Sequence, residues 1–122
     1  MITRLLKPGM RVLDIGCSTG QLLEFVKQFK CETYGIESSK PAQNICKERG
    51  HECFSSIEDI VNFAPFDVVF LLDTIEHIYD IPHFLSSIKE ILKSKGFVVL
   101  LTGNNNSIPA KIFKNNRILL LI

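Results

Sequence analysis

The feature that most limits the fold is the apolar run at residues 67–72, with the sequence DVVFLL. After its first residue the run is apolar at every position, so both faces of the strand that it predicts must be buried. Strands of this kind lie inside parallel sheets, where helices cover both faces. The run therefore predicts an α/β domain built around a parallel sheet.

Further short apolar runs predict the other strands of this sheet. A first strand is expected at residues 11–16 after the turn at Pro8 and Gly9, and a second at residues 32–37. Residues 51–54 predict a short third strand, and residues 97–101 a fifth. With the run at 67–72 as the fourth, we expect a doubly wound, Rossmann-like and mainly parallel sheet of about five strands, in the order 3-2-1-4-5.

Helical spacing separates these strands. Leu22, Leu23, Val26 and Phe29 predict a helix whose first amides Ser18 or Thr19 would cap.

Three further helices are expected. One begins at Ser39 and Pro41, turns Ala42, Ile45 and Cys46 inward, and ends at Gly50. A brief helix is predicted at residues 57–63. A helix at residues 81–93 carries one apolar stripe, and Gly96 would end it.

Composition narrows the class of protein. The chain has 122 residues, enough for a single domain over 1–122, and a formal net charge of +1. A near-neutral chain indicates no strongly attracted polyanion, so no nucleic-acid partner is expected. The four cysteines show no zinc-like grouping and are expected to be reduced and partly buried, with no metal site. No segment reaches the ~20 apolar residues of a membrane span, and a cytoplasmic location is the default.

The last part of the chain has a different character. Residues 103–106 predict a loop, and residues 108–114 one or two helical turns. The chain then ends in ILLLI at residues 118–122. Such an aliphatic end must pair with a sheet, pack under another segment or continue into further sequence. We favour truncation, with a core at 8–103 and with 104–122 as the start of a shortened C-terminal part.

Polar residues follow each predicted strand. Asp14 and the loop GCSTG at residues 16–20 follow the first strand, and Glu37 follows the second. Ser55 and Ser56 follow the third, residues 73–77 the fourth and residues 102–106 the fifth. In an open parallel sheet, ligands bind beyond the carboxyl ends of the strands. The pattern therefore predicts a nucleotide-type pocket at that edge.

The glycine loop and Glu37 together favour an adenosine ligand. A glycine loop that opens a helix favours an anionic group. An acid at the end of the second strand can accept hydrogen bonds from both ribose hydroxyls. Dinucleotides usually need G-x-G-x-x-G, and Ser18 stands where the second glycine belongs. The residues therefore favour S-adenosylmethionine, which has no pyrophosphate, and leave an NAD-binding domain as an alternative.

Four blocks in this order resemble the class I S-adenosylmethionine-dependent methyltransferases, in particular the ubiquinone and menaquinone biosynthesis type. VLDIGCSTG at residues 12–20 resembles motif I, and YGIE at 34–37 the acidic motif. FDVVFLLDTIEHI at 66–78 resembles the motif of the fourth strand, and LKSKGFVVL at 92–100 the block before the fifth. The resemblance implies a cofactor-binding half that lacks the family's C-terminal antiparallel strand pair.

The resemblance also implies roles for individual residues. Gly16, Cys17 and Gly20 would wrap the methionine portion, with Asp14 shaping the loop and contacting the amino group. Ser18 belongs to the same loop and replaces the family's central glycine, which is tolerable if its φ is negative.

The resemblance also implies roles for residues after the second, third and fourth predicted strands. Glu37 would bind the ribose diol, and Ser56 and Ile57 would border the adenine. Asp73 and Thr74 would line the methionine side. His77 would face the methyl-transfer region as a candidate base, or it packs over the fourth strand and holds a helix start. His51 and His83 receive no role.

The function that follows is methyl transfer from S-adenosylmethionine to a small-molecule acceptor, although this chain alone need not be active. A second hypothesis is a non-catalytic binding or interaction module that associates with a partner, or with itself, through residues 118–122. A nicotinamide-dependent dehydrogenase is the third.

Overall fold

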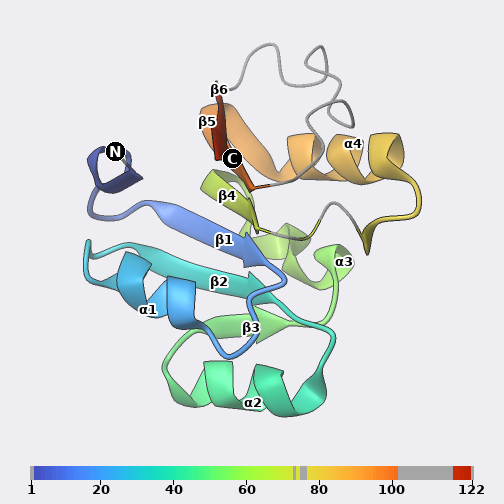
Figure 1. The fold of residues 1–122 in the computed structure, drawn as a ribbon. Coiled ribbons are helices and arrows are strands. Elements are labelled where there is room, and N and C mark those ends of the chain that lie inside the picture. Colours follow the sequence, from blue (N-terminus) through green and yellow to red (C-terminus); the bar gives the residue numbers. More distant parts are fainter. Residues whose placement is uncertain (1, 73, 75–76, 102–116, 122) are drawn as a thin grey trace.

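The structure, a computed structural model, describes residues 2–72, 74, 77–101 and 117–121. Its strands form one sheet in the order β3-β2-β1-β4-β5-β6, and every pairing in it is parallel. The predicted order 3-2-1-4-5 is therefore confirmed, with one strand added beyond β5. Figure 1 shows β3 and α2 at one side of the molecule and β6 beside β5 at the other.

The first half of the chain forms three strands joined by two helices. Strand β1 spans Arg11–Ile15, β2 spans Glu32–Ile36 and β3 spans Glu52–Phe54. Helix α1 (Gln21–Lys27) links β1 to β2, and α2 (Lys40–Glu48) links β2 to β3. A short 3-10 turn, η1 (Ile2–Arg4), precedes them. Each of these strands lies where the sequence predicts one, within a residue or two.

The second half contains the longest helix and the two longest strands, α4, β4 and β5. The brief helix predicted at residues 57–63 is confirmed as α3 (Ile57–Ile60) followed by η2 (Val61–Phe63). Strand β4 (Phe66–Leu72) lies between β1 and β5 and is the predicted central strand. Helix α4 (Ile81–Ile91), strand β5 (Leu92–Leu101) and strand β6 (Arg117–Leu121) complete the described chain.

Alternating side chains of the central strands separate two apolar layers. On β4, Val69 and Leu71 pack with residues of α3 and α4, whereas Val68 and Phe70 pack on the side of α1. All four are fully buried, as the apolar run predicts. The buried strand thus places its carboxyl end between two helix layers.

Two expectations for the glycine-rich loop are wrong. The N-cap of α1 is Gly20, which has a φ of 91° and no side-chain cap, so neither Ser18 nor Thr19 caps this helix. Ser18 has a φ of +53°, not a negative one. This left-handed conformation is uncommon for a residue with a side chain. The loop therefore keeps the backbone shape of a glycine at the position where the family has one.

The inward face of α2 also differs from the expectation. Ser39 caps the helix as predicted, since its Oγ accepts a hydrogen bond from the amide of Ala42 at 3.4 Å. Cys46 is buried, but Ile45 is 40% exposed and the polar Gln43 is buried in its place. The reason is a pair of hydrogen bonds that the Gln43 side chain makes at the carboxyl edge of the sheet.

The boundary between α4 and β5 lies earlier than predicted. The helix ends at Ile91, not Lys93, and β5 begins at Leu92 rather than Phe97. Leu92 pairs with Phe66, and the register then shifts so that Phe97 pairs with Val68. A bulge thus occupies the stretch that helical periodicity assigned to a helix end.

The aliphatic end of the chain pairs with the sheet, which is one of the three alternatives that its sequence allowed. Residues 117–121 run parallel to 97–101 of β5, and Ile118 packs against the core beside α4. The loop and helical turns predicted at 103–114 lie outside the described residues, and association through 118–122 stays a prediction, as does the single domain over 1–122. Among the described residues, no helix is both long enough and apolar enough to cross a bilayer.

Candidate functional site

The candidate site lies where β1, β2 and β4 end side by side. The glycine-rich loop, residues 16–20, leaves β1 directly after the buried Asp14 and Ile15, and Glu37 leaves β2 next to it. The amides of Gly16 and Cys17 both donate to the carbonyl of Ile36, at 2.8 and 3.0 Å. These bonds hold the loop against the end of β2, so the predicted neighbours at this edge do come together.

Glu37 is fixed by backbone amides on both sides. Its Oε1 accepts a hydrogen bond from the amide of Ser18 at 2.8 Å, and its Oε2 accepts one from the amide of Ser39 at 2.8 Å. The carboxylate therefore joins the glycine-rich loop to the start of α2. Each carboxylate oxygen has a second lone pair, so the half-exposed carboxylate can still accept hydrogen bonds from a ligand.

Gln43, for which the sequence predicted no role, supports this arrangement. Its Nε2 donates to the carbonyl of Glu37 at 2.6 Å and to the Oγ of Ser55 at 3.0 Å. The side chain is only 2% exposed, although it lies on a helix whose pattern suggested an apolar contact. No sequence pattern marks it, because its partners are a backbone carbonyl and a hydroxyl from other segments.

Asp14 is a buried acid at the centre of the edge. It is 5% exposed, and burial, followed by the negative charge of Glu37, raises its pKa from 3.8 to about 7. A cation placed near both acids would lower that pKa, because it favours the charged form of the carboxyl group. The two carboxyl groups thus form a locally electronegative site in a chain that is close to neutral overall.

Thr74 connects the end of β4 to the end of β1. Its hydroxyl lies 2.8 Å from the carbonyl of Ile15 and 3.1 Å from that of Leu72. Gly16 has a φ of +81°, and a Cβ on it would lie 3.1 Å from the Thr74 Oγ1. Thr74 therefore lies against the first glycine of the loop, on the side where the resemblance places the methionine portion.

His77 lies beyond Thr74, and its amide donates to the Thr74 carbonyl at 3.0 Å. Its side chain is exposed, and Asp80, not His77, caps α4 by accepting from the amide of His83 at 3.1 Å. These facts are against the alternative in which His77 packs over β4 and holds a helix start. Asp73 and Glu76 lie outside the described residues.

The other predicted site residues occupy more distant or more buried positions. The Ser56 Oγ donates to the carboxylate of Asp59 at 3.1 Å, and the half-buried Ile57 packs against the core at the start of α3. Cys17 is 4% exposed, and its sulfur lies 3.9 Å from that of Cys46. The side chain of Cys17 thus points toward α2 and into the core. Only the backbone of Cys17 can therefore contact a ligand at the carboxyl edge of the sheet.

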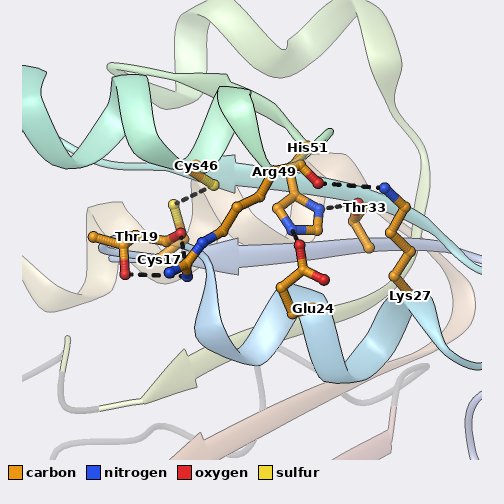
Figure 2. Close-up of polar contacts among 8 residues, drawn as sticks. All are labelled: Cys17, Thr19, Glu24, Lys27, Thr33, Cys46, Arg49 and His51. Atoms are coloured by element: carbon orange, nitrogen blue, oxygen red, sulfur yellow. Dashed lines mark hydrogen bonds and ion pairs between the residues drawn. The ribbon is translucent and has the colours of Figure 1, made fainter.

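Arg49 holds the loop from the side of α2, and His51 links α1 to β2 beside it, as Figure 2 shows. The guanidinium group of Arg49 donates to the carbonyl of Thr19 at 3.0 Å. His51 is buried between the Thr33 hydroxyl, at 2.6 Å, and the Glu24 carboxylate, at 3.2 Å. Burial lowers the pKa of His51 despite the nearby Glu24. His51, for which the sequence predicted no role, has a structural one between α1 and β2.

A cavity of about 320 Å³ lies at the other edge of the sheet. Glu32 and Glu52, the first residues of β2 and β3, line it together with Lys27 and Gly50. Ligands of open parallel sheets bind at the carboxyl edge instead. We therefore do not assign this cavity to the site formed by Asp14 and Glu37.

Comparison with known proteins identifies the family. The sequence profile of the methyltransferase domain matches residues 1–121. The chain belongs to the methyltransferase domain family. This agrees with the resemblance of the four sequence blocks and with the parallel sheet order.

Relatives and solved structures agree with this membership. A ubiquinone biosynthesis O-methyltransferase of Rhodopseudomonas palustris (strain BisB5) is 33% identical over 107 residues, which cover 80% of this chain and 42% of that protein. A phosphoethanolamine N-methyltransferase 2 of Haemonchus contortus, solved in complex with S-adenosyl-L-methionine, superposes with a TM-score of 0.70. It is 28% identical and matches 81% of this chain and 26% of its own.

A third match gives the same fold. A SAM dependent methyltransferase from Archaeoglobus fulgidus superposes with a TM-score of 0.63 at 25% identity, over 80% of this chain and 46% of its own. This methyltransferase-family chain thus spans about two fifths of the length of the curated relatives that it matches.

Proposed function

We propose that this chain binds S-adenosylmethionine at the carboxyl edge of its sheet and forms the cofactor-binding part of a methyltransferase. The observation that carries the proposal is the fixed carboxylate of Glu37, 2.8 Å from the amide of Ser18 in the glycine-rich loop. A ribose has two adjacent hydroxyl donors, and an oriented carboxylate with spare lone pairs is a suitable acceptor for them.

The other residues of the edge fit the remainder of this cofactor. Its methionine portion carries an ammonium group and a sulfonium centre, both positively charged. Asp14, a buried acid whose pKa burial raises to about 7, gains a counter-charge when such a group lies beside it. In this proposal Gly16, Cys17 and Gly20 receive the methionine portion through their backbone, with Ser18 above them and Thr74 beside them. Asp73 would complete that side, and Ser56 and Ile57 would border the adenine.

A dinucleotide fits the same edge less well. Its pyrophosphate carries two negative charges and would lie against the glycine-rich loop, beside the buried acid Asp14. Ser18 also has a side chain where close backbone approach to the pyrophosphate requires a glycine. The site therefore favours a cationic nucleoside over NAD.

The chemistry implied is an in-line transfer of a methyl group. When bound, S-adenosylmethionine supplies an electrophilic methyl group on a positively charged sulfur. The chain would hold the cofactor in one orientation and position the acceptor at the rim beyond β4. His77, exposed on that rim, is our candidate for the base that takes the acceptor's proton. The relatives named as O-methyltransferases of ubiquinone biosynthesis support a small-molecule acceptor that is methylated at oxygen.

The test of cofactor binding is calorimetric titration of the chain with S-adenosylmethionine and S-adenosylhomocysteine, with NAD as the competing ligand. Glu37→Ala should weaken binding about 10- to 150-fold, because a hydrogen bond to a charged acceptor contributes about 1.5–3 kcal/mol. Glu32→Ala, an exposed acid at the other end of β2, is the matched control and should bind normally. Tighter binding of NAD than of S-adenosylmethionine would refute the proposal.

The role of His77 is tested separately. His77→Ala should lower turnover about 10²–10⁴-fold and leave cofactor affinity unchanged, measured on whichever form of the protein shows activity. His83→Ala, on the exposed first turn of α4, is the control. Unchanged turnover in His77→Ala would exclude the base role without affecting the proposed cofactor site.

A further inference from the structure

Three cysteines from three different elements meet beneath the glycine-rich loop. Cys17 belongs to that loop, Cys46 to α2 and Cys53 to β3. The Cys17 sulfur lies 3.9 Å from that of Cys46 and 3.6 Å from that of Cys53, and all three sulfurs lie within 4.8 Å of one another. Figure 2 shows the Cys17 sulfur pointing toward Cys46 of α2. The proposed cofactor site uses none of these sulfurs.

The surrounding backbone leaves room for this three-thiol cluster of Cys17, Cys46 and Cys53. A Cβ on Gly35 would lie 2.5 Å from the Cys17 sulfur, and a Cβ on Gly20 would lie 2.9 Å from the Cys46 sulfur. A residue larger than glycine at either place would therefore displace a thiol. The three sulfurs are also almost inaccessible, with their residues 4%, 0% and 3% exposed.

The spacing of the sulfurs matches that of ligands around one metal ion. Three sulfurs that each lie about 2.3 Å from a central ion are about 4.0 Å apart in a plane and about 3.8 Å apart in a tetrahedron. The two short separations, 3.6 and 3.9 Å, are close to these values. A disulfide needs sulfurs about 2.05 Å apart, so the present arrangement is nearer to a metal site than to a bond.

We propose that the three-thiol cluster is a binding site for one soft monovalent metal ion of the Cu(I) type. Thiolate ligands select Cu(I) and zinc among the common metals, and zinc sites usually have four ligands. Within the part of the chain that the structure describes, no fourth histidine, cysteine or acid joins the group. Three-coordinate binding therefore favours the monovalent ion.

Metal binding requires protons to leave the cluster. Burial raises the pKa of Cys46 to about 11, and burial together with its two neighbouring thiols raises that of Cys17 further. The free thiols are therefore protonated at neutral pH and weak as nucleophiles. The metal takes the place of the protons, which are released to solvent. No electron is transferred, because the ion is supplied as Cu(I) and the oxidation state of the cysteine sulfurs does not change.

The test is an anaerobic titration of the fully reduced chain with Cu(I), in competition with a coloured Cu(I) chelator. One ion per chain is expected, with three sulfur ligands in its X-ray absorption spectrum. Cys46→Ser and Cys53→Ser should each lower the affinity at least about 100-fold. Cys31→Ser removes the remaining cysteine, which is buried in another cluster and donates to the Lys7 carbonyl at 3.4 Å, and should keep the native affinity.

A measurement on the native chain alone tests the proposal even if a cysteine variant fails to fold. The native chain alone, titrated with Cd²⁺ as an optical probe, should develop a thiolate-to-metal charge-transfer band that Cu(I) abolishes at one equivalent. Absence of Cu(I) uptake by the folded, reduced chain would overturn the proposal. Equal loss of affinity in Cys31→Ser, or a spectrum with nitrogen or oxygen ligands only, would overturn it as well.

Discussion

The two halves of the sheet are built from different interactions. The half made of β1, β2 and β3 carries a network of side-chain hydrogen bonds around Glu37, Gln43, Arg49 and His51. The half made of β4, β5 and α4 has an apolar core that includes Leu71 and Leu85, and this cluster continues onto β1 and β2. Hydrogen bonds orient the groups that they join, whereas apolar contacts mainly stabilise the folded state and are not directional. We infer that the first half determines the ligand and that the second half holds the first in shape.

A matched pair of core truncations gives the largest expected effects. Leu23 on α1 and Leu85 on α4 are both fully buried, one beneath the glycine-rich loop and one in the apolar half. Each change to alanine should lower the free energy of unfolding by about 2–5 kcal/mol. Only Leu23→Ala should also weaken S-adenosylmethionine binding by the folded protein, because it leaves a cavity under the loop.

Urea unfolding would measure the stability of both variants, and calorimetry their affinity. Equal loss of affinity in the two variants would contradict the proposal that the first half alone determines the ligand.

Crowding under the loop should have the next largest effect. In Gly35→Ala the new Cβ would meet the Cys17 sulfur at 2.5 Å, which forces the loop or β2 to move. Overpacking of this kind costs about 1–3 kcal/mol, and the displaced loop should bind the cofactor more weakly.

The double variant Gly35→Ala/Cys17→Ala provides the control, because it removes the sulfur that the new methyl group meets. It should recover part of the lost stability, as a double-mutant cycle in urea would show. Full additivity of the two changes would mean that the Cys17 sulfur is not the group that opposes a side chain at position 35.

These two halves also differ in how far their sequence revealed them. The run at 67–72 predicted the central strand and both faces of the core, because an unbroken apolar run of this length is typical of a strand covered on both sides. Asp14, Glu37 and the glycine-rich loop were predicted to lie together, since carboxyl ends of parallel strands share an edge. Periodicity could not show the buried Gln43, whose partners are a carbonyl and a hydroxyl from other segments. Nor could spacing reveal the three-thiol cluster, which depends on how three separate elements pack.

The dependence of binding on pH tests the electronegative character of the first half. The pKa of Asp14 is about 7 in the folded chain, and a cationic ligand binds best when this carboxyl is charged. Affinity for S-adenosylmethionine should therefore rise about tenfold per pH unit below pH 7 and level off above it. In Asp14→Asn the profile should be flat over this range, which calorimetry at constant ionic strength would show.

The free energy of unfolding of the ligand-free chain should fall with rising pH, whereas the affinity for S-adenosylmethionine rises. The folded chain keeps a proton on Asp14 that the unfolded chain releases near 3.8. Between these two pKa values the folded state binds more protons, so the free energy of unfolding falls as pH rises from about 4 to 7. A wild-type chain whose stability rises over that interval, relative to Asp14→Asn, would contradict the raised pKa.

The smallest expected effect concerns the contact between the halves. Thr74→Val removes the hydroxyl that lies 2.8 Å from the Ile15 carbonyl and keeps the shape of the side chain. The loss of one such hydrogen bond should lower the free energy of unfolding by about 1 kcal/mol. Cofactor affinity should fall several-fold, since Gly16 packs against the same hydroxyl. Ser87→Ala, which removes a hydroxyl bonded to the His83 carbonyl within α4, is the control and should change neither quantity measurably. If Thr74→Val behaves like Ser87→Ala, the apolar half supports the ligand edge through packing alone, without a specific hydrogen bond between the ends of β4 and β1.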